Sequence, residues 1–563
     1  MRTLHIKEVR IAGFKRFSHL QVNLTPGINI IVGDNDSGKS TLLEAIVAAV
    51  NGQYRGASLA RNLSEDLFNT ELVSDYLDKI GSHENCEPPE ILIEIVFDGD
   101  EDTVALYRGD CNSKGANESG ISLKIALDID SFAEEYQEFI ESGECYGIPI
   151  EYYACSWSTF ARKSIRPAGI KFGASLIGNG NASGWSNSRA MVSRIARGVL
   201  DPRDQIAISQ VHRRIRNEFS TDEAISSINE KISRETDSLT RKSVKFGFEA
   251  GTVNSWESGI VTTLEDIPFS NVGDGTKSIV STELALSKSK DRKRDVILLE
   301  EPENHLSHTK LNMLLDDVKK RCDDAQLVIT THSSFVANKM ELRNLILLNG
   351  DYSTTLSSLH EDTSRFFMKA PGYKTLRVLL CNVAILVEGD ADELVIQRAY
   401  MDAHDGRLPI QDGIDVISVG TSFLRFMEIA ALIGKPVVSV TDNDGDIEFL
   451  EKKYEDFPFI TSVEAEDLQT VSYPERLLPE GNKEKVNYNT LESEIYSSAG
   501  YEALGRILDK ITPDRDKSLN YMENHKTDVA LAIFDSTEKI EYPEYIIRAI
   551  EWASRKAGSD NNA

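Results

Sequence analysis

INIIVGDNDSGKST, residues 28 to 41, joins an apolar, strand-like run to a glycine-rich loop, and a helical stretch, TLLEAIVAAV, completes it. The loop matches G-x-x-x-x-G-K-[ST], with Gly33, Gly38, Lys39 and Ser40 at the fixed positions. Glycines let backbone N–H groups curl around phosphates, and the helix start adds its dipole. The pattern therefore predicts a P-loop that binds ATP with Mg²⁺, with Lys39 on the β- and γ-phosphates and Ser40 on the metal.

Two later strand-like runs end in residues that suit the same site. Val296 to Leu299 leads into Glu300 and Glu301, which are expected to hold the Mg²⁺ shell and to polarise the attacking water, respectively. Leu327 to Thr330 leads to His332, a candidate sensor of the γ-phosphate. The predicted nucleotide-binding residues are Gly33, Asn35, Gly38, Lys39, Ser40, Thr41, Glu300 and His332.

Two more apolar runs, AILVEGDAD at 384 to 392 and VVSVTDND at 437 to 444, each end in acids. Because the carboxyl ends of parallel strands meet at one edge of a sheet, we expect these acids to lie close together. Like charges at such distances need a cation, and carboxylate oxygens suit Mg²⁺ or Mn²⁺. The acids are Glu388, Asp392, Asp442 and Asp444.

The apolar pattern alternates strands and helices over most of the 563 residues, which predicts an α/β protein of more than one domain. A polar, helical, glycine-interrupted stretch at 158–245 reads as an insertion, and APGY at 370–373 marks a boundary. We therefore expect an ATPase domain in two parts, an inserted helical segment and a carboxylate domain. Their ranges are 1–157 and 246–372, 158–245, and 373–563. The clearest predicted strands are 28–32, 91–97, 296–299, 327–330, 384–387 and 437–440.

The net charge of −28 argues against nucleic acid as a partner on average. However, residues 158 to 217 hold eleven Lys and Arg against two acids, which suggests either a solvated helical face or a surface for DNA. No run of eighteen apolar residues predicts a membrane span, and the N-terminus does not resemble a signal peptide. The six cysteines are scattered, as in a reduced cytoplasmic protein without structural zinc.

FKRF near the N-terminus, the P-loop, EEPENHL and TTHS together resemble the ABC-type ATPases of the RecF and SMC group over residues 1 to 370. That group sandwiches ATP between two heads, so the resemblance implies a homodimer or a higher homo-oligomer, with the insertion as a dimerisation element. The candidate signature loop runs from Asn271 to Lys277 and has Val272 where a serine is expected, which argues against fast, dimer-coupled hydrolysis. The absence of sustained heptads excludes long coiled-coil arms.

A strand ending in EG followed by a strand ending in DxD resembles the TOPRIM domain, here over residues 376 to 563. An ATPase of this type followed by TOPRIM resembles the OLD (overcoming lysogenization defect) family, which includes the nuclease subunit of the Gabija anti-phage system. NTLESE, with Glu492 and Glu494, looks like the family's acidic segment, and HKTD, with Lys526, like its lysine segment.

The resemblance implies an ATP-regulated DNA endonuclease with two divalent ions at the TOPRIM site. The implied catalytic residues are Glu388, Asp442, Asp444 and Lys526, with Glu301 in the ATPase site. The implied metal ligands are Glu388, Asp392, Asp442, Asp444, Glu492 and Glu494, with Ser40 at the nucleotide. Cleavage by two metal ions would let Lys526 neutralise the reacting phosphate.

Two other functions stay open from the sequence. A RecF-like repair or clamp ATPase would bind DNA through TOPRIM without cutting it, although the intact acid set argues against this. A topoisomerase would need a tyrosine nucleophile in a DNA-cleaving domain, which none of the eighteen tyrosines marks. The sign of ATP control, and a helicase or reverse-transcriptase (retron) partner, also stay open.

Overall fold

The computed structural model describes residues 4–82, 87–142, 147–178, 202–240, 260–286, 296–304, 306–321, 325–369, 373–460, 466–478 and 487–560. Two compact units make up the chain. The first holds Met1–Ile31, Asp36–Thr331 and Gly350–Ser353, and the second holds Val32–Asn35, His332–Asn349 and Thr354–Ala563. Among the described residues, no helix combines the length and the apolar character needed to cross a bilayer.

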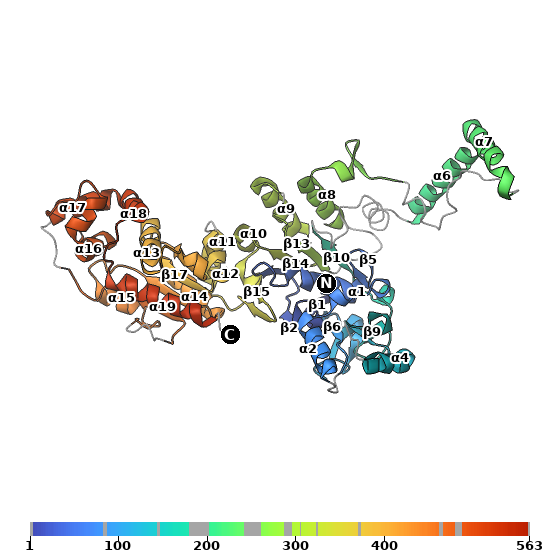
Figure 1. Cartoon of the computed structure of the whole chain (residues 1–563), viewed down its shortest axis with the longest axis horizontal. Helices are drawn as coiled ribbons and strands as arrows, with labels where there is room; N and C mark the ends of the chain where they lie inside the picture. Colours follow the sequence, from blue (N-terminus) through green and yellow to red (C-terminus); the bar gives the residue numbers. More distant parts are fainter. Residues whose placement is uncertain are drawn as a thin grey trace. The chain divides into compact units, whose positions relative to one another are not determined.

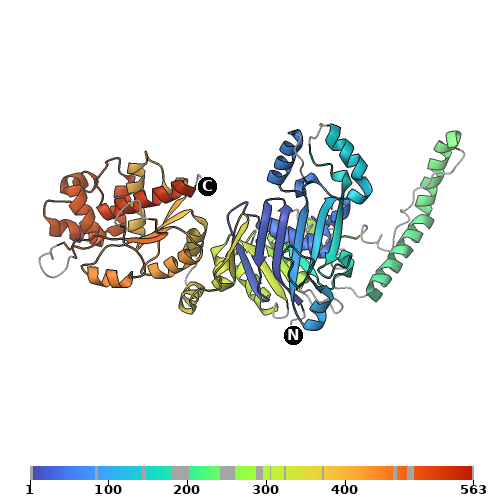
Figure 2. The ribbon, with the colours of Figure 1, turned by 90° about the horizontal axis from the view of Figure 1, so that it is seen from below.

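The first sheet of the ATPase region is antiparallel, whereas the sequence pattern suggested parallel sheets. Its strands run in the order β2-β1-β6-β8-β7, and β9 also pairs with β8 (Figure 2). The hairpin between β1 and β2 explains the difference, because Phe14 pairs with Phe17 across two residues and Lys15 has a φ of 52°. The strands are β1 Leu4–Phe14, β2 Phe17–Asn23, β6 Ile91–Gly99, β7 Arg108–Gly109, β8 Glu118–Leu127 and β9 Tyr153–Thr159.

The second sheet carries the P-loop and has the order β10-β13-β14-β3-β15-β16. Its strands are β3 Ile28–Val32, β10 Ala174–Ile177, β13 Val296–Glu300, β14 Gln326–Thr331, β15 Leu345–Asn349 and β16 Tyr352–Thr355. The predicted strands at 28–32, 91–97, 296–299 and 327–330 are thus confirmed as β3, β6, β13 and β14. β10 pairs in parallel with β13, so these four residues belong to the sheet although they lie inside the stretch expected to be an insertion. Four residues, three of them apolar, between glycine-rich segments are too short a signal to mark a strand.

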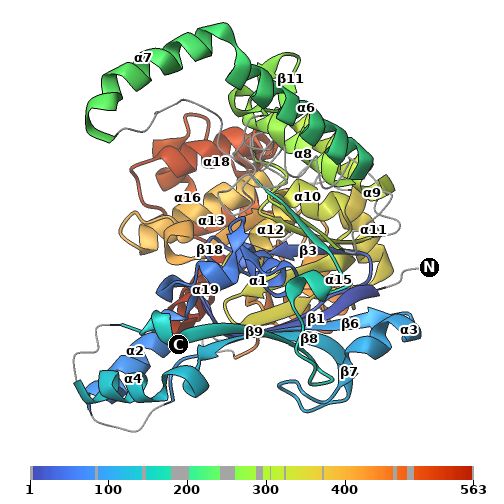
Figure 3. The same cartoon turned by 90° about the vertical axis from the view of Figure 1, so that its right-hand side faces the viewer.

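A helix and a glutamine side chain join these two sheets. Helix α1, Lys39–Asn51, packs against β1, β6 and β8 of one sheet and against β10 and β13 of the other (Figure 3). Gln326 is buried at the start of β14, donates to the carbonyls of Ile6 and Thr25 and accepts from the Ile6 N–H at 2.9 Å. The amide therefore satisfies backbone groups that burial would otherwise leave unpaired.

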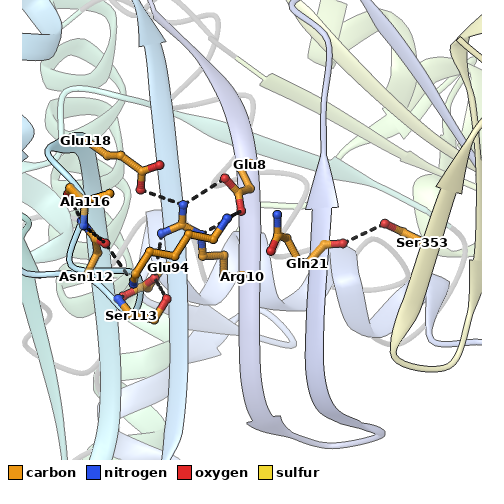
Figure 4. Close-up of polar contacts among 10 residues, drawn as sticks. Glu8, Arg10, Gln21, Glu94, Asn112, Ser113, Ala116, Glu118 and Ser353 are labelled. Carbon is orange, nitrogen blue, oxygen red and sulfur yellow. Dashed lines mark hydrogen bonds and ion pairs between the residues drawn. The ribbon is translucent and has the colours of Figure 1, made fainter. Parts of the chain in front are cut away.

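A buried charge cluster lies on β1, β6 and β8 (Figure 4). Arg10 donates from Nε to Glu8 at 2.8 Å and from Nη2 to Glu118 at 2.7 Å, and its Nη1 lies 3.4 Å from Glu94. Ser113 donates to Glu94 at 2.6 Å, so the β7–β8 turn closes over the charges. Burial raises the pKa of Glu8, but Arg10 and a lysine on this turn outweigh it, and the net pKa is lowered.

The remaining helices of the first unit cover these sheets or lie in the predicted insertion. Helices α6 and α7 follow one another across Asp222, whose side chain accepts from the N–H of Ala224 at 2.9 Å (Figure 3). Short β-pairs form β4 Gln53–Tyr54 with β5 Ala57–Ser58, and β11 Thr263–Leu264 with β12 Ile267–Pro268. The helices are α2 Thr70–Gly81, α3 Glu101–Val104, α4 Ile129–Ser142, α6 Pro202–Thr221, α7 Glu223–Thr240, α8 Asp274–Leu286 and α9 His308–Arg321.

The second unit contains a four-stranded parallel sheet in the order β18-β17-β19-β20 (Figure 1). Its strands are β17 Val383–Val387, β18 Ile414–Ser418, β19 Val437–Val440 and β20 Gln469–Ser472, which confirms the runs predicted at 384–387 and 437–440. Helices α13 and α19 pack against the sheet together, while α12 and α14 pack against each other and against β18, β19 and β20. The two pairs of helices lie on opposite faces of the sheet, as the strand order requires. The right-handed crossover from β17 to β18 runs in one direction and the crossover from β18 to β19 in the other, so their helices lie on different sides.

The helices of this unit have the following bounds: α10 Ser334–Lys339, α11 Glu361–Lys369, α12 Tyr373–Leu380, α13 Asp390–Ala403, α14 Phe423–Leu432, α15 Ile447–Lys453, α16 Leu491–Ile507, α17 Arg515–Asn524, α18 Lys526–Asp535 and α19 Glu544–Asp560. α16, α17 and α18 share one apolar core with α13, α19 and the central strands. This core fixes the C-terminal helices onto the sheet.

Candidate functional site

The P-loop lies where the sequence predicts it, between β3 and α1. Gly38 caps α1 with a φ of 96°, and any Cβ at this position would meet the ring of Phe17, so only glycine fits. Lys39 and Ser40 open the helix, and Lys39 is buried, with its Nζ 3.5 Å from the Ser37 hydroxyl. Gly33 and Asn35 lie in the loop before the helix, and Thr41 lies in its first turn. The loop therefore aims the N-terminus of a helix at the predicted phosphate position.

Ser40 and Glu300 come together as the nucleotide site requires. Ser40, in the first turn of α1, lies close enough to the carboxylate of Glu300 at the end of β13 to lower its pKa. Burial raises the pKa of Glu300, Ser40 lowers it, and the charges of Glu301 and Glu44 raise it, with a raised pKa as the net result. The second carboxylate oxygen, Oε2, is buried and has no hydrogen-bond partner among the described residues. Two predicted partners of Mg²⁺ thus lie side by side with acceptor capacity to spare.

The other ATPase residues follow the same strands. Glu301 has a φ of 42°, donates its N–H to the Thr330 carbonyl at 2.9 Å and accepts from the Asn304 amide at 2.7 Å. His332 follows the end of β14 and is half-buried. The loop with Val272 directly precedes α8. The roles of Glu301, His332 and Val272 stay predictions.

Glu388 and Asp392 lie at the turn between β17 and α13. The carboxylate of Asp392 caps this helix by accepting from the Gly389 N–H at 2.9 Å. Glu388 is exposed at the end of the strand, and its carbonyl accepts from the Gly420 N–H at 3.0 Å. The strand–glycine–helix turn therefore presents one acid to solvent and places the other on the helix beside it.

Asp442 and Asp444 lie in the turn after β19, on the adjacent strand. Asp444 has a φ of 47°, and its N–H donates to the Asn489 carbonyl at 3.0 Å. Between the two acids, the buried Asn443 amide donates to the carbonyls of Pro474 and Arg476, each at 2.8 Å. Asn443 thus fixes the turn that carries the two acids.

The start of α16 brings the predicted acidic segment to the same place. The Leu491 N–H donates to Oδ2 of Asp442 at 3.1 Å, so the helix N-terminus points at this carboxylate. Glu492 and Glu494 in the first turn are 4% and 2% exposed. Lys526, the first residue of α18, has its Nζ 3.2 Å from Oε1 of Glu492. Two segments that sequence resemblance alone had linked to the site therefore lie against it.

The electrostatics show that these acids act on one another. Burial raises the pKa of Asp442 to about 8, with the charges of Asp444, Asp392 and Glu388 adding to it. Burial also raises the pKa of Asp392 to about 6, helped by Glu492 and Glu388. Repulsion among carboxylates at this edge favours a bound cation.

The donor chemistry of this edge fits a divalent cation. Three buried carboxylate oxygens have no hydrogen-bond partner among the described residues: Asp442 Oδ1, Glu492 Oε2 and Glu494 Oε1. Hard oxygen donors of this kind are the ligands that Mg²⁺ and Mn²⁺ prefer. Within the described ranges, however, no three acidic, imidazole or thiol groups converge closely enough to hold an ion as they are placed. The carboxylates would have to move toward one another, and the assignment of ligands stays a prediction.

Sequence reasoning missed four residues of this neighbourhood. Arg476 donates to Oε2 of Glu494 at 3.1 Å, and Asn489 accepts from Asp444. Burial raises the pKa of Tyr545 on α19, and the charges of Asp442 and Asp392 raise it further, so this ring lies close to the acids. The charges of Glu388 and Asp444 act on the pKa of Lys453, at the end of α15. Only the fold brings these residues to the site, because none belongs to a recognisable motif.

The fold and both sites define a P-loop nucleotide-binding protein with a carboxylate-lined parallel sheet in its C-terminal unit. Family models make this specific: residues 8–166 match an AAA domain, and residues 183–338 match a second AAA domain linked to the AbiEii toxin of type IV TA systems. Residues 379–444 match the TOPRIM domain of "Overcoming lysogenization defect protein-like". The chain therefore carries AAA ATPase domains followed by an OLD-like TOPRIM domain, as the sequence predicted.

Curated relatives resemble short stretches only. The DNA replication and repair protein RecF of Clostridium botulinum (strain Eklund 17B / Type B) is 37% identical over 43 residues, 8% of this chain and 12% of that protein. The DNA double-strand break repair Rad50 ATPase of Pyrococcus abyssi (strain GE5 / Orsay) is 33% identical over 106 residues, 19% of this chain and 10% of the relative. The chain thus spans about a tenth of the length of these relatives.

Among solved structures, the C-terminal region of the OLD protein of Xanthomonas campestris pv. campestris is 20% identical and covers 32% of this chain and 98% of its own, with a TM-score of 0.23. A TM-score this low carries no argument, so the domain assignment rests on the family models and on the geometry.

Proposed function

We propose that this chain is an ATP-regulated, divalent-metal-dependent DNA endonuclease. The observation that carries the proposal is that acids from three separate segments, the turns after β17 and β19 and the start of α16, lie near one edge of the sheet beside Lys526, close enough to raise one another's pKa. Burial, and then the charges of its neighbours, raise the pKa of Asp442, and one of its buried oxygens has no hydrogen-bond partner among the described residues. Such a cluster has no structural use that a hydrophobic core would not serve better, and it is suited to metal-assisted hydrolysis of phosphodiesters.

In this proposal, Asp442 and Asp444 hold one divalent ion, and Glu388, Asp392 and Glu492 hold a second, with Glu494 beside them. Ions bound there would activate water and neutralise the leaving 3′ oxygen. The chain's own residues prepare this chemistry. The N-terminus of α16 orients Asp442 through the Leu491 N–H, and Lys526 supplies a positive charge for the phosphate under attack.

ATP would act as a control on cleavage. Ser40 and Glu300, the two residues expected on the Mg²⁺ side of the nucleotide, lie close together, which supports this role. Val272 replaces the serine expected in the signature loop, which favours binding over rapid turnover. We further propose a homodimer or higher homo-oligomer, with DNA as the substrate and anti-phage defence as the biological role, the last from family resemblance alone.

Purified protein with supercoiled plasmid, Mg²⁺ or Mn²⁺, with and without ATP, tests this function. Open-circle or linear product is expected, and EDTA should prevent it. Relaxed closed circles would indicate a topoisomerase instead. Unchanged plasmid under all conditions would contradict the nuclease and favour a DNA-binding clamp ATPase, which the short similarity to RecF makes the second candidate. Titrating ATP in the same assay gives the sign of its control.

A further inference from the structure

Lys453 ends helix α15 with its ammonium group held between two aromatic rings. Nζ lies 5.4 Å from the centroid of the Phe423 ring and 5.0 Å from that of Tyr454. The two rings contact edge to face, with centroids 6.5 Å apart. Cation–π attraction and the buried stem together restrict the positions that this side chain can take.

The rings place the ammonium group beside the carboxylate edge of the sheet. The Gly420 N–H donates to the carbonyl of Glu388, and Phe423 opens α14 three residues later. Burial lowers the pKa of Lys453, and the charges of Glu388 and Asp444 partly oppose this, so both acids lie within electrostatic range. Lys453 therefore lies within electrostatic range of the exposed acids Glu388 and Asp444, whereas Lys526 pairs with the buried Glu492.

Lys453 differs from the other cations of the site in its pairing. Lys526 is 3.2 Å from Glu492, and Arg476 is 3.1 Å from Glu494. Among the described residues, no carboxylate lies within 4.0 Å of the Lys453 ammonium group. Cation–π contacts and longer-range charges stabilise its position instead. Once metal ions neutralise Glu388 and Asp444, this ammonium group would be available to a phosphate oxygen.

We infer that Lys453 is a phosphate-binding residue of the carboxylate site, which holds a DNA backbone phosphate next to the one under attack. The inference rests on the proposed function. Lys453 and Lys526 would then grip the strand on the exposed and buried sides of the acids, and this arrangement would set the strand's direction across the site. A phosphate contact of this kind carries no sequence information, so binding should weaken equally on different duplexes.

The test uses the full chain with Lys453→Met, which keeps the stem against the rings, Lys453→Arg, which keeps the charge, and Lys452→Met as the matched control. Lys452 is the exposed neighbour on the same helix. The probe is a fluorescent DNA duplex, and its Kd is measured by anisotropy in EDTA and in Ca²⁺ over a series of salt concentrations. Thermal melts establish that each variant is folded.

Lys453→Met should raise Kd by about tenfold and reduce the slope of log K against log salt by about one unit. Lys453→Arg and Lys452→Met should stay near wild type. In plasmid cleavage, Lys453→Met should raise KM with little change in kcat. A Kd and salt slope like those of Lys452→Met, or a loss of kcat with unchanged KM, would overturn the inference. Wild-type protein that binds DNA but never cleaves it would refute the proposed function alone, because the binding measurements still decide the role of Lys453.

Discussion

Lys526 Nζ lies 3.2 Å from Oε1 of Glu492, a carboxylate only 4% exposed, while the lysine side chain itself is half exposed. One oxygen of Glu492 is thus matched by a positive charge, and the other, Oε2, has no partner among the described residues. The pair joins α16 to α18 at the acid cluster. Lys526 is half exposed beside the acids, so its charge is accessible to a ligand as well as to Glu492.

Replacing Lys526 separates its chemical role from its structural one. We expect Lys526→Met to lower the rate of plasmid cleavage by about 100-fold, because a charge that stabilises the reacting phosphate is lost. The free energy of unfolding should fall by about 1–3 kcal/mol, because the buried Oε1 of Glu492 loses its partner. Urea denaturation and single-turnover cleavage measure the two effects. Equal cleavage by the variant and wild type would exclude Lys526 from the reaction, and Lys510→Met, another lysine of the same unit, serves as the control.

Asp442→Ala should abolish metal-dependent cleavage while ATP binding stays intact. Even outer residues of metal sites cost about 10- to 100-fold when removed, so the central acid of this cluster should cost more than about 100-fold. The control is Glu448→Gln, an exposed acid on α15. Cleavage is followed on plasmid and ATP binding by equilibrium titration. Retained cleavage by pure Asp442→Ala protein would refute the proposed site.

Divalent ions should stabilise the folded protein without nucleotide. Asp442, Asp392 and Glu388 repel one another, and a bound cation relieves this repulsion only in the folded state. At a metal concentration 100-fold above Kd, the gain would be about 2.7 kcal/mol, visible as a higher Tm. The shift should shrink in Asp442→Asn. A Tm that ignores Mg²⁺ and Mn²⁺ in wild type would argue that the acids do not form a metal site.

The sequence predicted the strands that carry the chemistry, because each is an uninterrupted apolar run that ends in polar residues. It did not predict the antiparallel sheet, whose strands are set by a hairpin at Lys15, nor β10, whose four residues form a strand only by pairing with β13. Local pattern therefore identified buried strands and left pairing partners undetermined.

The same limit applies to the candidate site. Glu388 and Asp442 were predictable because they end neighbouring parallel strands, where geometry brings their side chains together. Lys453, Arg476 and Tyr545 were not, because only tertiary packing brings them near the acids. Their spacing in the sequence carries no periodic or motif signal.

Replacing Arg10 should lower the stability of the fold rather than the rate of cleavage. Arg10→Met would leave Glu8 and Glu94, 5% and 2% exposed, without their shared cation (Figure 4). Breaking a buried ion pair from one side costs about 3–5 kcal/mol, so the urea midpoint should fall strongly. Arg108→Met, which removes an exposed cation from the same sheet, should change nothing measurable. An unchanged urea midpoint for Arg10→Met would show that water or a rearrangement replaces the contacts that Arg10 makes with the buried carboxylates.

Lys39→Ala should change how cleavage responds to ATP rather than remove cleavage. Lys39 lies in the first turn of α1, next to Ser40, while the acids around Asp442 belong to the other compact unit. Loss of its charge should weaken ATP binding by about tenfold or more, because charge-assisted hydrogen bonds to phosphate are lost. The ATP concentration that gives half of the maximal effect on plasmid cleavage should rise in proportion. The cleavage rate without ATP should match that of wild type. Lys79→Ala, an exposed lysine on α2, is the control. If Lys39→Ala instead abolished cleavage without ATP, nucleotide binding would be part of the cleaving state itself, and the P-loop would not act as a separate gate.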